Sequence, residues 1–260
     1  MRHGRVNNPA NKDSMIESDS SKDTLFANPH NQLVDFAFTD AVADVFPDMI
    51  RRSVPGYDAV IALLGVIARQ YIQPDSHVYD LGCSLGASTL SMCQQVQDSS
   101  VQFIGVDNSV AMTQRCEKVL QRHAPSANIV IHCADIETID INNASLVVIN
   151  FTLQFLPESQ RLTLLKKVYA GLRKGGALVL SEKLSFPKQV EQHQYTQLHY
   201  EFKRANGYSE LEISQKRSAL DQVMIPDSLE THVKRLKQAG FSDVSQWFQS
   251  FNFASLLAIK

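Results

Sequence analysis

The feature of this sequence that most constrains its fold is a regular alternation of short apolar runs with longer helical segments between residues 77 and 182. The apolar runs predict strands at 77–81, 102–107, 128–133, 145–150 and 177–182. Helices are predicted after the first, second and fourth of these strands, ending near residue 96 and spanning 109–123 and 157–172. Such strand–helix repeats favour a parallel sheet with helices on both faces. With two more strands expected at 244–248 and 253–259, we predict an α/β fold: a doubly wound, mostly parallel seven-stranded sheet ending in an antiparallel hairpin.

The N-terminal part of the chain precedes this alternation. Residues 1–29 are rich in Asn, Asp, Ser and Lys and lack periodic apolar positions, so we expect a disordered tail. Two helical segments, at 40–52 and 58–72, come before the first strand, and Pro47 is expected to interrupt the earlier one.

A second segment outside the alternation lies at 186–224. It is polar and helix-prone, and it is too long for a loop in a compact sheet, so we expect a helical cap. A helix at 227–239, closed by Gly240, then leads to the terminal hairpin. We therefore predict one α/β domain over residues 30–260, with the cap as an insertion.

Composition limits the classes of function. The 260 residues carry a formal net charge of −2 and a pI near 6.4, so the overall field does not favour a phosphate-rich partner, and we expect no direct nucleic-acid binding. The four cysteines form no C-x-x-C pair, and no apolar run has the length of a membrane span. We therefore expect a cytoplasmic protein with no metal site, no disulfide framework and no membrane anchor.

The glycine-rich turn VYDLGCSLGAS, at 78–88, has two interpretations. Its G-x-S-x-G spelling, centred on Ser84, is that of a hydrolase nucleophile elbow, and the same residues form a strand-to-helix turn typical of nucleoside sites. An elbow needs a sheet before the serine, an upstream oxyanion loop, and an acid and a histidine at later strand ends. Here the serine follows the first strand, no such loop precedes it, and His199 and His232 lie in helical patterns. We interpret Ser84 as a loop residue that contacts a ligand.

A nucleoside site also requires an acid at the end of the next strand, about 20 residues further on, to accept from the ribose hydroxyls. Asp107 is in that position, 21 residues after Gly86. Gly82 and Gly86 allow the backbone to approach the ligand, and Asp80 is expected at the base of the loop, facing the ligand's polar end. The D-x-G-x-S-x-G form resembles the first motif of class I S-adenosylmethionine-dependent enzymes. An acid at this loop suits a ligand with a cationic amino group and sulfonium.

Two later strand ends fit the same interpretation. Asp135 can accept from an adenine amino group, while Ile136 offers a backbone N–H and an apolar face. Asn150 ends its strand at the edge where ligands bind in such sheets. The residues alone leave open that Asp135 is a capping residue and that Asn150 is structural.

Six longer runs resemble one family. They are DVFPDMIRRSVPGY (44–57), VYDLGCSLGAS (78–88), VDNS (106–109), NFTLQFL (150–156), GGALVLSEK (175–183) and FKRANGYSELEISQKRSAL (202–220). On these runs the sequence resembles the carboxy-S-adenosyl-L-methionine synthases, from about Lys22 to the C-terminus. The resemblance implies a class I methyltransferase-like Rossmann fold, with S-adenosyl-L-methionine as substrate and carboxy-S-adenosyl-L-methionine as product.

The resemblance also implies the reaction and its residues. It implies that prephenate carboxylates S-adenosylmethionine, giving phenylpyruvate and water, and that the product serves the carboxymethylation of wobble uridine in tRNA. The ligand residues it implies are Tyr57, Gly82, Cys83, Ser84, Asp107, Asn108, Asp135, Ile136, Asn150 and Arg217. Arg217 is expected to form a bidentate pair with the new carboxylate and Tyr57 to donate a hydrogen bond to it, so these two are the predicted catalytic residues.

Other functions remain open at this point. An S-adenosylmethionine-dependent methyltransferase acting on a small molecule or on tRNA shares every cofactor residue, but it has no need of Arg217 beside the sulfonium methyl. A noncatalytic protein that carries the nucleoside to a partner enzyme is a third class.

The cap has features of an interaction surface. Its aromatic residues favour a homodimer in which the cap covers the active site of its own or the neighbouring protomer, and a lid packed only on its own chain is the alternative. The plain interpretation of the pairs Lys203–Arg204 and Lys216–Arg217 is a solvated helix face.

Overall fold

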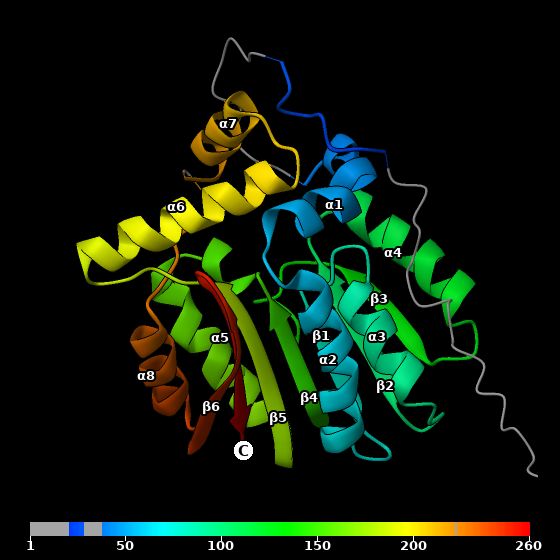
Figure 1. Cartoon of the computed structure of the whole chain (residues 1–260). Helices are drawn as coiled ribbons and strands as arrows, with labels where there is room; N and C mark the ends of the chain where they lie inside the picture. The colour runs from blue at the N-terminus through cyan, green and yellow to red at the C-terminus, as the bar shows by residue number, and fades with distance from the viewer. Residues whose placement is uncertain (1–20, 29–37, 222) are drawn as a thin grey trace, which may run out of the picture.

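The computed structural model describes residues 21–28, 38–221 and 223–260, and its centre is one sheet (Figure 1). Within these residues seven strands lie in the order β3-β2-β1-β4-β5-β7-β6. Their bounds are β1 His77–Leu81, β2 Gln102–Asp107, β3 Ile129–Cys133, β4 Ala144–Asn150, β5 Leu172–Lys183, β6 Asp243–Ser250 and β7 Phe253–Ile259. The first five pair in parallel, and β7 pairs antiparallel with β5 and β6. The predicted doubly wound, mostly parallel sheet with a terminal hairpin is confirmed.

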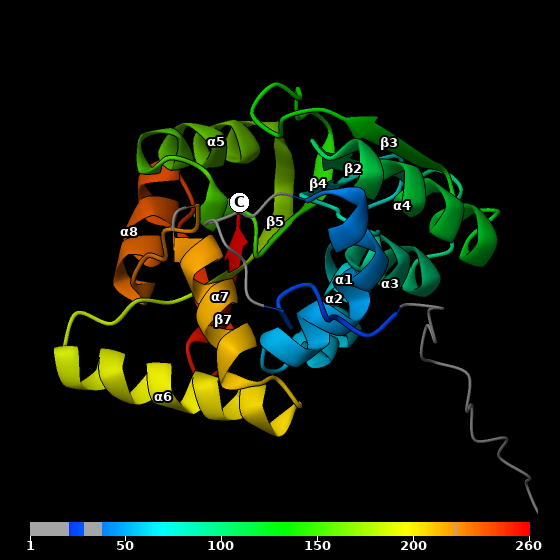
Figure 2. The same cartoon turned by 90° about the horizontal axis from the view of Figure 1, so that it is seen from above.

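Helices cover both faces of this sheet (Figure 2). On one face are α2 (Tyr57–Tyr71), α3 (Ala87–Gln95) and α4 (Val110–His123). On the other face are α5 (Glu158–Gly171) and α8 (Leu229–Ala239).

Each face of the sheet has its own apolar cluster. Successive strand side chains point to opposite faces, so Val78 packs in the cluster with Leu64 of α2, and Tyr79 packs in the cluster with Leu165 of α5. All four side chains are buried. Burial of apolar side chains on both faces explains why the strands are almost continuously apolar in the sequence.

Local signals place most helix ends as expected. Ser109 caps α4 by accepting a backbone N–H of its first turn, and Pro157 immediately precedes α5. In contrast, α1 (Asp40–Ser53) continues through Pro47, which was expected to interrupt it. Val42 and Met49 bury the apolar face of α1, and this packing holds the helix where proline removes a backbone hydrogen bond.

The α5–β5 junction also differs from the sequence expectation. The sequence predicted a helix at 157–172 and a strand at 177–182, with the turn at Lys174–Gly176 between them, but β5 begins directly after the last residue of α5, Gly171. The pairing of β5 with β4 shifts register across this turn, and Gly175 has a left-handed φ of +76°. The glycines therefore form a bulge inside the strand.

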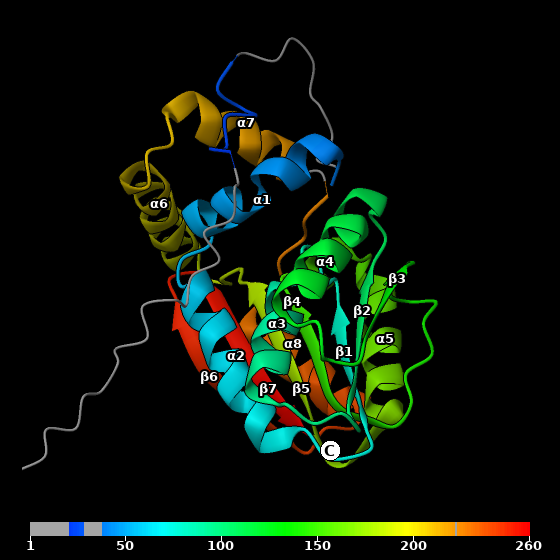
Figure 3. The same cartoon turned by 90° about the vertical axis from the view of Figure 1, so that its right-hand side faces the viewer.

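Three helices form a layer over the carboxyl ends of the parallel strands (Figures 1 and 3). They are α1, α6 (Gln189–Ala205) and α7 (Glu210–Asp221), and α6 contacts both of the others. The helical segment expected at 186–224 is thus present as α6 and α7, and we call α1, α6 and α7 the cap layer. In the described part of the chain, no helix combines the length and apolar character needed to cross a membrane.

Part of the expected N-terminal tail packs against the cap layer. Residues 1–20 and Pro29 lie outside the described residues, so for them disorder stays a prediction. Asp23 is buried, and its carboxylate accepts from Tyr208 Oη at 2.5 Å and from Lys216 Nζ at 3.1 Å. The expectation of disorder is wrong for the segment around Asp23, because its partners come from distant cap residues that local composition does not reveal.

Candidate active site

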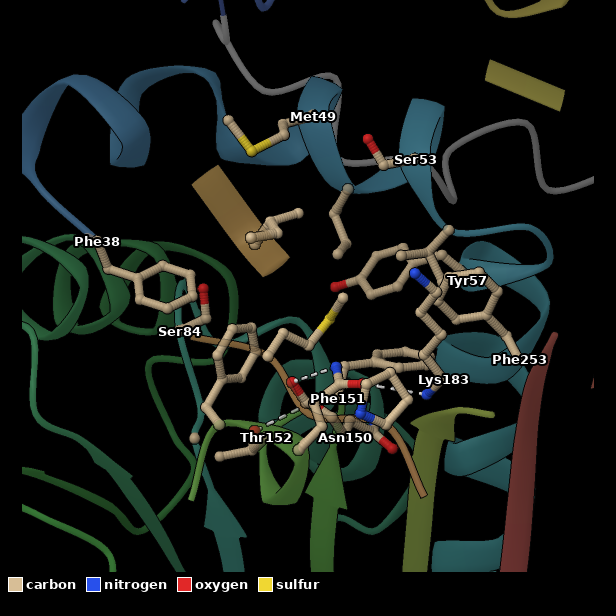
Figure 4. Close-up of a pocket in the computed structure, with 18 of the residues that line it drawn as sticks. Phe38, Met49, Ser53, Tyr57, Ser84, Asn150, Phe151, Thr152, Lys183 and Phe253 are labelled. Atoms are coloured by element: carbon tan, nitrogen blue, oxygen red, sulfur yellow. Dashed lines mark hydrogen bonds between the residues drawn. The ribbon is translucent and has the colours of Figure 1, made fainter. Parts of the chain in front are cut away.

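A cavity of about 750 Å³ lies between the carboxyl ends of the parallel strands and the cap layer (Figure 4). This volume is within the range of small-molecule sites. The sequence-predicted residues that line it are Tyr57, Gly82, Cys83, Ser84, Asp107, Asn108, Asp135, Ile136, Asn150 and Arg217. Among the described residues, no group of three or more His, Cys, Asp or Glu side chains is placed to hold a metal ion.

The loop after β1 requires glycine at both ends. Gly82 has a φ of +86°, and a Cβ there would overlap the side chain of Thr152. Gly86 has a φ of +85° and starts α3, and a Cβ there would lie 2.8 Å from Cys116 Sγ. These constraints fix the loop so that Cys83 and Ser84 line the cavity.

Ser84 lacks the partners of a nucleophile. Its hydroxyl contacts Met112 Sδ at 3.6 Å. The one histidine that lines the cavity, among the described residues, is His199, and its Nε2 donates to Ser53 O at 2.8 Å. Burial lowers the pKa of His199 to about 3, so its ring is neutral. The interpretation of Ser84 as a loop residue agrees with this geometry, and the elbow interpretation does not.

Asp107 organises the glycine loop from the end of β2. Its Oδ2 accepts the N–H of Ser84 at 3.0 Å, and its Oδ1 accepts the N–H of Ser109 at 2.9 Å. Burial raises the pKa of Asp107, while these two hydrogen bonds act in the opposite direction. A carboxylate oxygen can accept more than one hydrogen bond. Asp107 can therefore hold the loop and still accept from a pair of ribose hydroxyls.

The segment after β3 presents a second carboxylate. Asn108 Nδ2 donates to Asp135 Oδ1 at 2.9 Å, which fixes the carboxyl group and leaves its other oxygen for a ligand. Thr138 bonds to the backbone oxygen of Asp135, so the side chain of Asp135 is not the cap of that turn. Ile136 is buried and lines the cavity beside it. This combination of acceptor and apolar face suits an adenine ring.

Asn150 is held by its neighbours at the end of β4. Its Nδ2 donates to Ser88 Oγ at 2.9 Å, and its Oδ1 accepts from Ser181 Oγ at 2.7 Å. These bonds join α3, β4 and β5, so Asn150 has the structural role that the sequence left open, and it also lines the cavity.

Tyr57 is the first residue of α2, directly after Gly56, whose φ is +80°. Its ring lies 6.3 Å from that of Phe151, which in turn lies 6.0 Å from that of Phe253, and Figure 4 shows the three together in the cavity. Burial and then the nearby carboxylate of Asp80 raise the pKa of Tyr57, so the phenol keeps its proton and can donate a hydrogen bond.

Arg217 reaches the same cavity from α7 of its own chain. Its Nε lies 3.3 Å from Asp221 Oδ2, and both side chains are more than half exposed. An exposed pair of this kind contributes little energy and is easily exchanged for another anion. The guanidinium is thus available to a ligand carboxylate.

Comparisons with known proteins agree with this geometry. A family described as "Methyltransferase domain" matches residues 78–176. A carboxy-S-adenosyl-L-methionine synthase of Geobacter sp. (strain M21) is 54% identical over 239 residues, which cover 92% of this chain and 98% of that protein. A protein of the same name from Shewanella piezotolerans is 55% identical over 241 residues, covering 93% and 99%. The chain belongs to the carboxy-S-adenosyl-L-methionine synthase family.

Solved structures support the fold. A putative O-methyltransferase from Nostoc punctiforme PCC 73102 superposes with a TM-score of 0.61 at 14% identity, covering 85% of this chain and 59% of that one. A possible exported protein from Bordetella parapertussis superposes with a TM-score of 0.60 at 17% identity, covering 88% and 75%. At these identities the likeness concerns the fold alone.

Two residues predicted from the glycine loop, Asp80 and Gly86, do not line the cavity. Asp80 lies beneath the glycine loop, where its Oδ2 accepts from Thr89 N at 3.1 Å and Thr89 Oγ1 at 2.7 Å. Burial raises its pKa to about 6. Asp80 therefore anchors the first turn of α3. The expectation that its carboxylate faces the cavity and the ligand's polar end is wrong. Gly86 shapes the turn without reaching the cavity surface.

The cavity lining also includes basic residues that were not predicted as site residues, among them Lys183, His199, Lys203 and Lys216. Interpreting Lys203 and Lys216 as a solvated helix face is wrong, because they are 5% and 3% exposed. Burial lowers the pKa of Lys203 to about 7 and that of Lys216 to about 8. Helical spacing of charges does not distinguish a face turned to solvent from one turned to a polar cavity.

Proposed function

We propose that this protein converts S-adenosyl-L-methionine and prephenate to carboxy-S-adenosyl-L-methionine, phenylpyruvate and water. The observation that carries the proposal is the presence of Arg217 in the same cavity as the strand-end residues Asp107 and Asp135. The two carboxylates can accept hydrogen bonds from an adenosyl ligand, and the guanidinium can pair with one added carboxylate. Relatives with about 54% identity over 92% of the chain are named for the same product, which supports the proposal.

In this proposal the adenosyl ligand lies across the strand ends. Asp107 accepts from the ribose hydroxyls, Asp135 and Ile136 hold the adenine, and the loop at 82–86 contacts the methionine part. Since β1 lies between β2 and β4, this placement directs the sulfonium toward the centre of the sheet, below Tyr57 and the cap layer.

The reaction balances without an added reagent. Prephenate loses its ring carboxyl group as carbon dioxide and its hydroxyl group as hydroxide, and the ring becomes the aromatic ring of phenylpyruvate. The hydroxide removes one proton from the sulfonium methyl, which gives water and an ylide. The ylide carbon then attacks carbon dioxide and forms the carboxylate of the product. This route needs no protein general base, and no carboxylate–histidine pair is found among the described cavity residues.

Protein groups hold the charges that appear in these steps. Arg217 exchanges its exposed contact with Asp221 for the new carboxylate and pairs with it in a planar, bidentate way. Tyr57 keeps its proton and donates a hydrogen bond to the same group. The apolar ring cluster of Tyr57, Phe151 and Phe253 keeps water away from the ylide.

The test is incubation of the purified protein with S-adenosylmethionine and prephenate, followed by mass spectrometry of the nucleoside. The proposal predicts the mass gain of carbon dioxide, together with phenylpyruvate. A protein that leaves this mixture unchanged but methylates an acceptor is a methyltransferase. One that binds the nucleoside and changes neither substrate is a carrier. Either result overturns the proposal.

The setting of the reaction is part of the same proposal. We infer a cytoplasmic homodimer whose product is consumed in the carboxymethylation of wobble uridine in tRNA, without direct nucleic-acid binding by this chain. The exposed apolar residues Val190 of α6 and Leu211 of α7, 80% and 41% exposed, support a dimer contact on the cap. Light scattering at micromolar concentration tests it, and a monomer contradicts it.

A further inference from the structure

The cavity is polarised along the sheet. Asp107 ends β2 and Asp135 follows β3, on one side of β1 and β4, while Lys183 ends β5 on the other side. Lys203 of α6 and Arg217 of α7 line the same cavity from above. The carboxylates proposed for the adenosyl group thus lie on one side of the cavity, and the proposed binding of the nucleoside gives no role to Lys183 or Lys203 on the other.

Two of these basic groups, Lys183 and Lys203, lack a direct polar partner. Neither Lys183 Nζ nor Lys203 Nζ forms a hydrogen bond or an ion pair with any residue in 21–28, 38–221 or 223–260. Lys203 is 5% exposed, and its own burial, followed by the charges of Lys216 and Lys183, lowers its pKa. Burial likewise lowers the pKa of Lys183, and Figure 4 shows that residue among Tyr57, Phe151 and Phe253. Neither Nζ is sealed in the protein interior, because both side chains line the cavity, so an anion bound there can reach them.

The neighbouring groups do not satisfy these lysines. Lys216 has its own partner in Asp23, and His199 is neutral and bonded to Ser53. Asp221 is the carboxylate that faces this side of the cavity, and it already contacts Arg217. The basic groups on this side (Lys183, Lys203 and Arg217) thus outnumber Asp221, so the side favours a bound anion, which would also stabilise the protonated form of each lysine.

We propose that Lys183 and Lys203 form a subsite for a small dianion of the dicarboxylate class, held over β5 beside the sulfonium methyl. The assignment rests on the proposed function, in which the carboxyl donor carries two carboxylates. The two lysines hold the donor, and Arg217 receives the carboxylate that forms on the nucleoside. After the transfer the donor has lost one of its two charges, so the lysines bind the remaining monoanion less tightly and release it.

The test measures donor binding without turnover. Prephenate is titrated calorimetrically into protein saturated with S-adenosylhomocysteine, which lacks the reactive methyl group. Lys183→Met and Lys203→Met are expected to weaken prephenate binding by about 10–100-fold each, as the loss of a charge-assisted hydrogen bond predicts. The affinity for S-adenosylhomocysteine should stay within about 2-fold of wild type, which is a change of less than about 0.5 kcal/mol in binding free energy. Lys188→Met is the matched control, since Lys188 is exposed and pairs with Glu191 outside the cavity.

The outcomes separate this subsite from the proposed function. If both lysine variants bind prephenate as wild type does, the subsite is wrong, even when wild type forms carboxy-S-adenosylmethionine. If wild type makes no such product but binds succinate in a manner that depends on Lys183 and Lys203, the subsite stands and the proposed function fails. If wild type binds neither dianion, the subsite is wrong. Should a methionine variant fail to fold, as judged by circular dichroism, Lys183→Gln and Lys203→Gln replace it with the same expectation.

Discussion

Replacing Asp23 with asparagine tests whether the N-terminal segment is a structural part of the cap. The Asp23 and Lys216 side chains are 1% and 3% exposed, and the same carboxylate accepts from Tyr208. The Asp23→Asn variant would keep the size of the side chain but leave the Lys216 ammonium without its counter-charge. Breaking a buried pair from one side costs about 3–5 kcal/mol. For a chain of this size that corresponds to a fall in melting temperature of roughly 6–20 °C.

Thermal unfolding followed by circular dichroism measures this loss. Glu191→Gln is the control, because it breaks the exposed Lys188–Glu191 pair and is expected to change stability by less than about 1 kcal/mol. The double variant Asp23→Asn with Lys216→Met removes the uncompensated charge and should recover most of the loss. A melting temperature for Asp23→Asn within about 2 °C of wild type would refute the reasoning. It would mean that the segment around Asp23 does not hold the cap.

The remaining predictions concern the glycine loop, the turn after β4 and acid stability. Gly82→Ala should weaken S-adenosylmethionine binding at least about 10-fold by calorimetry, since its Cβ overlaps Thr152, whereas Gly175→Ala, with only Gln73 within 4 Å, should leave that affinity unchanged. Equal affinities in the two variants would contradict this. Glu182 accepts the N–H groups of Leu153 and Gln154 at 2.9 and 3.0 Å, and Glu182→Gln leaves one of them without an acceptor, so urea unfolding should show a loss of about 1–3 kcal/mol. Both ring nitrogens of His232 are buried without a partner among the described residues, and burial lowers its pKa to about 4. As pH falls, the unfolded chain therefore binds a proton at this histidine before the folded protein does, so wild type should lose stability between pH 6.5 and 4. Urea titrations across that range should show a smaller loss for His232→Leu. Identical losses in the two proteins would contradict this explanation.

The fold was predictable because its determinants are local and periodic. Continuous apolar runs such as 145–150 identify strands buried on both faces, and Ser109 and Pro157 mark helix starts by their own chemistry. The expectations that proved wrong concern residues whose structure depends on contacts with distant parts of the chain. Asp23 is ordered by partners nearly 200 residues away, Tyr208 and Lys216.

The candidate site was predictable to the extent that it is built on strand ends. Parallel strands bring their carboxyl ends to one edge, so Asp107, Asp135 and Asn150 meet there whatever the loops do. Asp80 was misjudged because its position in the motif does not show that its carboxylate turns toward Thr89. The lysines of the cap were missed because only the packing of α6 and α7 over the sheet reveals which face of each helix is buried.

The most direct test of the central claim compares the affinity of the protein for carboxy-S-adenosylmethionine with its affinity for S-adenosylmethionine. Wild type should prefer the carboxylated nucleoside by about 10-fold or more, through the Arg217 guanidinium. Arg217→Met should abolish that preference and keep the affinity for S-adenosylmethionine, while Arg204→Met, which removes an arginine paired with Glu201 and Glu210 outside the cavity, should retain it. An Arg217→Met protein that still prefers the carboxylated nucleoside as strongly as wild type does would contradict the role assigned to this residue.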